Sequence, residues 1–206
     1  MNRIILAFVV LVCAPASALA QTEGKVSVGG SVTHVITTDD EAASVTGVGF
    51  VVRLNPKRGW GPAAALNWFR ADIDNPSGEP GDFARLRIRP LMGGIAYTIG
   101  PDKLLTSFSI VAGASFNSFD FRDDFLDRVS AAGLQEPSVD IETSFVIRPG
   151  VNVTWTVAPR VAIIGFGGYM YNRPDVVYRD PFGAEFRNNW KADAVVFSVG
   201  AVYSLF

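Results

Sequence analysis

The chain has 206 residues, of which 49% are hydrophobic and 18% are charged, and its formal net charge is −2 at pH 7. This balance, without a cluster of basic residues, argues against a nucleic-acid-binding protein. Beyond the N-terminus, no apolar run approaches the roughly 20 residues that a membrane-spanning helix needs, which excludes a helical membrane protein.

The N-terminus has the features of a secretory signal peptide. A positive charge is followed by a short apolar stretch and then by the small residues Ala18 and Ala20, which form a cleavage site. We therefore expect residues 1–20 to be removed and residues 21–206 to form one domain. The only cysteine, Cys13, lies in the signal, so no disulfide is expected in the mature chain.

The rest of the chain contains eight extended runs that are bounded by turn residues. The connections between them alternate between short turns and longer polar loops, and the longest loop, 122–138, is predicted to hold a short helix. This pattern predicts an all-β fold, an eight-stranded antiparallel up-and-down transmembrane β-barrel with short periplasmic turns and longer extracellular loops. The runs cover about 25–37, 44–54, 62–73, 83–99, 104–121, 139–157, 160–178 and 184–206.

Apolar and polar residues alternate along these runs with a period of two, as expected for strands that face different surroundings on their two sides. In the run 139–157, for example, Phe145 and Trp155 share one face and Arg148 lies on the other. The alternation changes parity near Phe69 and near Gly93, where we predict β-bulges or glycine kinks.

Alternation alone does not separate a membrane barrel from a soluble, lipocalin-like barrel whose apolar face points inward. The aromatic residues favour the membrane, because they gather at both ends of the predicted strands, as in the interfacial girdles of membrane barrels. The predicted girdle residues are Trp60, Tyr97, Trp155 and Tyr203 at the short-turn end, and Trp68, Phe119, Tyr171 and Trp190 at the long-loop end.

The signal peptide, the eight amphipathic runs, the alternating connections and the terminal Phe206 together resemble the OmpA/OmpX-type superfamily of small outer-membrane β-barrels. The resemblance rests on pattern and not on a catalytic motif, so it implies a fold more than a function. It implies a monomer in the cell outer membrane, in contact with outer-membrane lipids and lipopolysaccharide. It also implies insertion by the barrel-assembly machinery, for which Phe206 would be the signal.

A predicted lumen charge network is the most distinctive polar feature. Three arginines alternate on one face of the run 83–99, and an arginine facing the middle of the bilayer costs about 2–4 kcal/mol, so we expect them to point inward. The network would either plug the lumen or form a gate or binding site for an anion or a polar solute. Its predicted members are Arg53, Arg85, Arg87, Arg89, Asp140, Glu142 and Arg148.

No catalytic residue, metal site or cofactor is predicted. The only histidine, His34, lies near the long-loop end of its run, where lipid A-modifying barrels carry a histidine, but the chain has no matching serine arrangement. We therefore expect a structural or surface-interaction role through the extracellular loops, with the lumen plugged by side chains. The alternatives are an OmpW-like conduit for small or hydrophobic compounds and a lipid A-modifying enzyme.

Overall fold

The computed structural model describes residues 25–38, 44–55, 58–74, 82–180 and 182–205. The predicted signal peptide, residues 1–20, and the terminal Phe206 lie outside the described residues.

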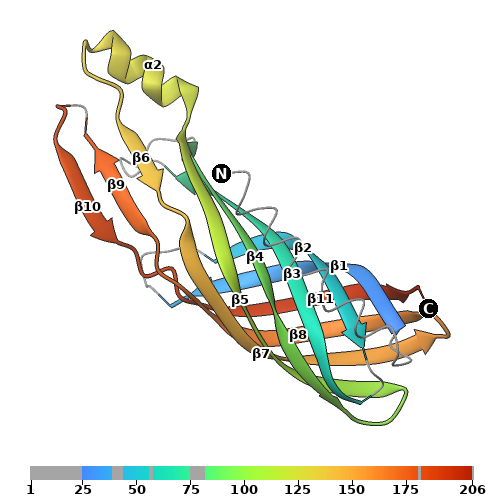
Figure 1. Cartoon of the computed structure of the whole chain (residues 1–206). Coiled ribbons are helices and arrows are strands. Elements are labelled where there is room, and N and C mark those ends of the chain that lie inside the picture. Colours follow the sequence, from blue (N-terminus) through green and yellow to red (C-terminus); the bar gives the residue numbers. More distant parts are fainter. Residues whose placement is uncertain (1–24, 39–43, 56–57, 75–81, 181, 206) are drawn as a thin grey trace.

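Eight strands form a closed antiparallel barrel in the order β1-β11-β8-β7-β5-β4-β3-β2 (Figure 1). All of the neighbouring pairs are antiparallel, which confirms the predicted fold class. The strands are β1 (Lys25–Thr37), β2 (Val45–Asn55), β3 (Gly59–Asp74), β4 (Asp82–Ile99), β5 (Leu104–Phe121), β7 (Ser144–Ala158), β8 (Val161–Asn172) and β11 (Ala194–Ser204).

The last strand closes the barrel against the first. The register of β1 on β11 runs from Ser27 opposite Ser204 to Thr37 opposite Ala194. The hydroxyls of Ser27 and Ser204 lie 3.1 Å apart, and the ladder continues where the amide of Leu205 donates to the carbonyl of Val26. Where all eight strands pair, the closed barrel leaves no strand edge unpaired, which is the condition for β-structure in a bilayer.

One end of the barrel, here called the loop end, carries additional structure. The connection from β5 to β7 folds into the helix α2 (Asp123–Ala131) and the strand β6 (Ser138–Ile141), so the helix predicted in the longest loop is confirmed. Strand β6 joins a hairpin of β9 (Asp175–Arg179) and β10 (Glu185–Asn189) in a three-stranded sheet of order β10-β9-β6. Figure 1 shows this sheet and α2 projecting beyond the barrel. The short turns lie at the opposite end of the barrel, here called the turn end.

The outer face of the barrel is apolar over the middle of the strands. Alternate residues of each strand are exposed there, and they are mostly large aliphatic or aromatic side chains. Because exposing such a continuous apolar surface to water is unfavourable, this band is the part of the barrel that would contact lipid. Members of the band include Val32, Val48, Phe50, Leu91, Ile95, Phe108, Ile110, Val153, Ile163, Phe197 and Val199.

The predicted parity changes in β3 and β4 are wrong. The register of β4 on β5 is unbroken from Ala84 opposite Phe121 to Ile99 opposite Thr106, and β3 shifts against β4 only at Ile73/Asp74. What changes along these strands is the kind of residue on each face. Toward the loop end the inner face becomes apolar, as at Phe69, and the outer face becomes charged.

No helix in the described part of the chain is long and apolar enough to cross a membrane.

Candidate functional site

The three arginines of β4 point away from the barrel interior, contrary to our prediction. Their neighbours Leu86 and Met92 are the inward residues, with 8% and 1% of their surface exposed. The side chain of Arg87 is 43% exposed and forms an ion pair of 3.4 Å with Asp120 on the outer face of β5. Arg85 and Arg89 lie on the same face of β4 as Arg87. These arginines avoid the cost of facing lipid because they lie toward the loop end of a long strand, beyond the middle of the apolar band.

The predicted acidic members of the lumen network are also misplaced. Asp140 and Glu142 are both exposed, and neither contributes to the barrel interior. The predicted run that contains them is broken at residues 142–143, and its first part, β6, pairs with β9 instead of β5. Since the break reverses the parity, Ile141 is buried at 6% exposure and Asp140 faces outward.

Arg53 and Arg148 point into the barrel. Arg53 donates from Nη1 to the Thr154 hydroxyl at 2.8 Å and from Nη2 to the Ser107 hydroxyl at 2.6 Å. A hydrogen bond of 2.9 Å links the hydroxyls of Ser107 and Thr98. This network joins hydroxyl groups from three strands to Arg53 in the half of the interior nearer the turn end.

Arg148 occupies a second level of the interior, closer to the loop end. Its Nη1 donates to Oδ1 of Asn67 at 3.0 Å, and its guanidinium carbon lies 4.7 Å from the centre of the Phe166 ring. Its Nε is buried and has no hydrogen-bond partner. A buried donor without a partner is unusual and calls for an explanation.

Packed side chains occupy most of the remaining interior. A cavity of about 260 Å³ opens at the turn end, where Ser27, Thr154 and Arg160 contribute to its lining. A smaller cavity of about 40 Å³ is lined by both Arg53 and Arg148. Toward the loop end the interior is an apolar core of Val35, Ala65, Phe69, Met92, Val111, Val146, Met170, Ala194 and Val196.

Beyond this core, the loop end carries an open apolar pocket of about 370 Å³, here called the outer pocket. Two of its residues, Leu86 and Phe119, are paired across β4 and β5 on the inner face of these strands. The three-stranded sheet supplies the opposite wall. The outer pocket is lined by Leu86, Phe119, Val139, Ile141, Val176, Tyr178, Phe186, Asn188 and Trp190.

Phe119 and Trp190 thus line the outer pocket, and their prediction as membrane-interface residues is wrong. The inward parity of Phe119 and the position of Trp190 after β10 turn both rings toward the pocket. The other predicted girdle residues are exposed on the outer face, as the girdle requires, although their depth in a membrane stays a prediction. They are Trp60, Trp68, Tyr97, Trp155, Tyr171 and Tyr203.

The barrel wall divides beside the outer pocket. Strand β5 pairs with β7 only as far as Ser115 opposite Ser144, whereas β5 itself continues to Phe121 along β4. At the point of division, the Asn117 side-chain amide donates to the Glu142 carbonyl at 3.2 Å. From there outward the two parts of the wall belong to different sheets, and the outer pocket lies between them.

Asp193 fixes the base of the β9-β10 hairpin. Its buried carboxylate accepts a hydrogen bond of 3.1 Å from the backbone amide of Asn172 and forms an ion pair of 3.1 Å with Arg173. The backbone carbonyl of Asp193 accepts a hydrogen bond of 3.0 Å from the backbone amide of Thr38. Three segments that are far apart in the sequence, at the loop ends of β1, β8 and β11, are thereby held together. This arrangement sets the position of the wall that carries Val176 and Tyr178.

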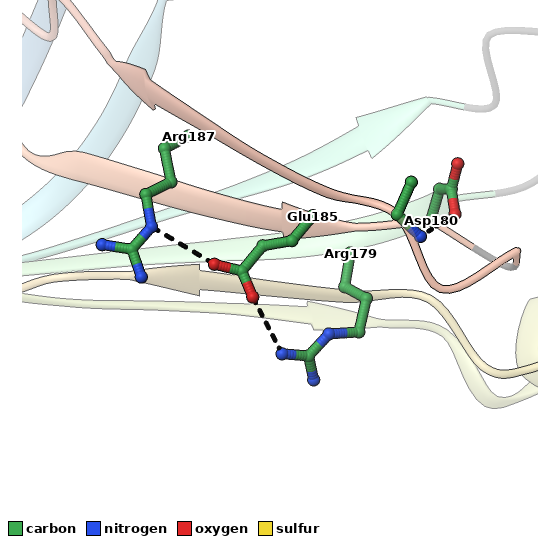
Figure 2. A network of polar contacts seen from close by, with 5 residues as sticks. Arg179, Asp180, Glu185 and Arg187 are labelled. Atoms are coloured by element: carbon green, nitrogen blue, oxygen red, sulfur yellow. Dashed lines mark hydrogen bonds and ion pairs between the residues drawn. The ribbon is translucent and has the colours of Figure 1, made fainter.

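The far end of the hairpin is held by exposed polar contacts (Figure 2). Glu185 accepts from Arg179 at 3.1 Å and from Arg187 at 3.2 Å, and these hydrogen bonds lower the pKa of the Glu185 carboxyl below its usual value. Asp180 accepts from the amides of Phe182 and Ala184, both at 2.9 Å, and so shapes the turn.

His34 is exposed on the outer face of β1, where its Nδ1 lies 3.0 Å from the Thr46 hydroxyl. The described residues contain no group of three or more histidine, cysteine or acidic side chains that could hold a metal ion.

Comparison with known proteins gives matches of structure only. No protein-family model and no curated protein sequence matches the chain. The outer membrane protein OprG from Pseudomonas aeruginosa superimposes with a TM-score of 0.68 at 15% identity, over 89% of this chain and 97% of OprG. A major outer membrane protein from Thermus thermophilus superimposes with a TM-score of 0.62 at 13% identity, over 89% of this chain and 100% of that protein. Outer Membrane Protein W from E. coli superimposes with a TM-score of 0.52 at 18% identity, over 90% of this chain and 100% of that protein. The fold is therefore that of small outer-membrane β-barrels.

Proposed function

We propose that this chain, an outer-membrane β-barrel by fold, has a surface-interaction role in which the outer pocket binds a compact apolar molecule while the lumen stays plugged. The observation that carries the proposal is the outer pocket itself. Its volume of about 370 Å³ falls in the range of small-molecule sites, roughly 300–1,000 Å³.

The lining of the outer pocket supports an apolar ligand with a planar or aromatic part. Phe119, Tyr178, Phe186 and Trp190 supply aromatic surface, and rings of this kind stack on flat ligands. Asn188 adds one amide that can orient a single polar group of the ligand. No charged side chain is among the described residues that line the pocket, so an ionic ligand is disfavoured.

The barrel interior supports a plugged lumen. The hydroxyl network around Arg53, the contacts of Arg148 and the apolar core succeed one another between the turn end and the outer pocket. An eight-stranded barrel has an interior that side chains just fill. A solute bound in the outer pocket would therefore have no aqueous path through the barrel.

A conduit for small or hydrophobic compounds is the second candidate function, and the division of the wall favours it. From Asn117 outward, β5 has no ladder with β7, so a compound in the outer pocket lies next to a gap in the sheet and not behind a continuous wall. Such a compound could pass sideways toward the outer leaflet. Uptake of a pocket ligand by cells would separate this function from surface binding alone.

The outward arginines of β4 support contact with lipopolysaccharide, which we retain as a proposed partner. Guanidinium groups bind phosphate through paired, charge-assisted hydrogen bonds, and Arg87 and Arg89 lie on the outer face near the loop end. We assign no catalytic role to the chain, since the sequence offers His34 no matching serine arrangement.

Replacing Val176 with aspartate tests ligand binding in the outer pocket. The change places a carboxylate in the apolar lining that Val176 shares with Phe119 and Trp190. The cost of desolvating it is expected to weaken binding at least tenfold, or about 1.4 kcal/mol. The probe is the apolar fluorophore 1-N-phenylnaphthylamine, titrated against the protein in lipid nanodiscs, with empty nanodiscs subtracted.

Val177→Asp is the matched control, because Val177 lies next to Val176 on the opposite face of β9, between Arg187 and Asp140 of the two neighbouring strands. We expect saturable binding to the parent protein and to Val177→Asp, and only lipid partitioning with Val176→Asp. Saturable binding of the same strength to all three proteins would contradict the proposed function.

A further inference from the structure

Two buried arginines lie inside the barrel. Arg53 is 5% exposed and Arg148 is 8% exposed. Among the residues whose burial the structure describes, the only buried carboxylate is that of Asp193, which lies at the loop end and is paired with Arg173. Buried charges are normally paired, since water no longer screens or solvates them.

The neutral partners of the two arginines do not replace a counter-ion. Arg53 is held by the hydroxyls of Thr154 and Ser107, and Arg148 by the Asn67 amide oxygen and the Phe166 ring. None of these groups carries a charge. The buried Nε of Arg148 still has a hydrogen to donate.

A cavity of about 40 Å³ lies between these side chains and is lined by both arginines. Roughly 10–15 Å³ is enough for one water, so the cavity has room for one monatomic anion. The rest of its lining is apolar or neutral and includes the polar groups of Ser31, Asn67, Ser109, Asn152 and Ser198. Asp102 is the acidic residue that lines the separate cavity at the turn end.

We propose that this cavity binds one small inorganic anion of the halide class between Arg53 and Arg148. The anion accepts hydrogen bonds from the guanidinium groups and neutralises part of their charge. It thereby fills the cavity and helps to plug the lumen. The site is separate from the outer pocket, with the apolar core between them. Thr154, a hydrogen-bond partner of Arg53, also lines the turn-end cavity, so the Arg53 network lies next to that cavity.

Bromide tests this site, because it resembles chloride in size and is visible by anomalous scattering. Purified protein in detergent micelles is melted in sodium gluconate and in sodium bromide at equal ionic strength. Binding to the folded state alone raises the melting temperature, by about 5 °C for an ion well above its dissociation constant. The shift is expected in the parent protein and in Arg187→Met, which removes an exposed arginine. It is expected to be absent in Arg53→Met and Arg148→Met.

Crystals of the parent protein grown in bromide decide the question even if a variant does not fold. An anomalous peak in contact with the guanidinium groups of Arg53 and Arg148 supports the proposal. Bromide crystals with no anomalous peak in the cavity overturn it. Equal bromide shifts in the parent protein and in a folded Arg148→Met variant overturn it as well.

Discussion

Replacing Gly200 with valine is expected to prevent closure of the barrel. Gly200 faces Ser31 across the β1-β11 seam, and a Cβ added there would overlap the carbonyl oxygen of Gly30 and lie 2.7 Å from the Cα of Ser31. Both obstacles are backbone atoms, which cannot move aside without separating the two strands. Overpacking of ordinary interiors costs about 1–3 kcal/mol, and we expect a loss of at least about 3 kcal/mol here.

Gly165→Val is the control for this prediction. Gly165 lies on β8 in the same barrel, but a Cβ added to it meets no atom within 4 Å. The measurement is the fraction of protein that migrates as a folded barrel on unheated SDS gels after refolding into lipid vesicles. We expect this fraction to fall strongly for Gly200→Val and to stay at the parent level for Gly165→Val. A similar folded fraction for both variants would mean that the seam can open enough to accept a side chain.

Replacing Val199 with arginine is expected to cost about 2–4 kcal/mol of folding free energy in a bilayer. Val199 is 66% exposed on the outer face of β11 and lies in the middle of the apolar band. A charge there faces hydrocarbon, and the position is too far from either end for the side chain to reach water easily. Urea titration of the protein in lipid vesicles measures the loss.

Phe116→Arg makes the same chemical change nearer the loop end. Phe116 is also on the outer face, at 47% exposure, but it pairs with Arg89 and lies on the charged part of the surface. Near an interface the cost of an arginine falls to about 0–1 kcal/mol. Repulsion from Arg89 opposite adds up to about 1 kcal/mol. Equal losses for the two variants would refute the boundary that we place between the apolar band and the charged loop end.

The period-two pattern was sufficient to predict the eight strands, their order and the lipid-facing residues around Val199. The same pattern also predicted that the side chains of Arg53 and Arg148 point inward, because both residues lie in the part of their strands where the outer face is uniformly apolar. Turn residues marked the connections, and strong local signals such as Gly100 and Gly133 do have positive φ angles in the structure.

The prediction failed for Arg85, Arg87 and Arg89 because it assumed that one face of β4 meets lipid along its whole length. Strand β4 has 18 residues, whereas about 9–11 suffice to cross a bilayer. Beyond the band, the outer face meets polar surroundings and the inner face becomes the apolar one. The surplus length of β4 and β5 was the available signal for this inversion.

The outer pocket could not be predicted from the local pattern, because its walls depend on pairing between distant segments. Strand β6 could have continued the ladder on β5, yet it pairs with β9, which brings Val139 opposite Tyr178. The alternation within each segment is compatible with either partner. The break at residues 142–143, which reverses the parity, contains no glycine or proline to mark it.

An apolar molecule that binds in the outer pocket and goes no deeper contacts a defined set of methyl groups. Intermolecular nuclear Overhauser effects between naphthalene and methyl-labelled protein, in nanodiscs whose lipids are deuterated, measure these contacts. We predict contacts to the methyl groups of Val139, Ile141 and Val176, and none to Val146 or Val196 of the apolar core. Contacts to the core methyl groups, or to those of the lipid-facing Val153 and Val199 alone, would exclude the outer pocket as the binding site.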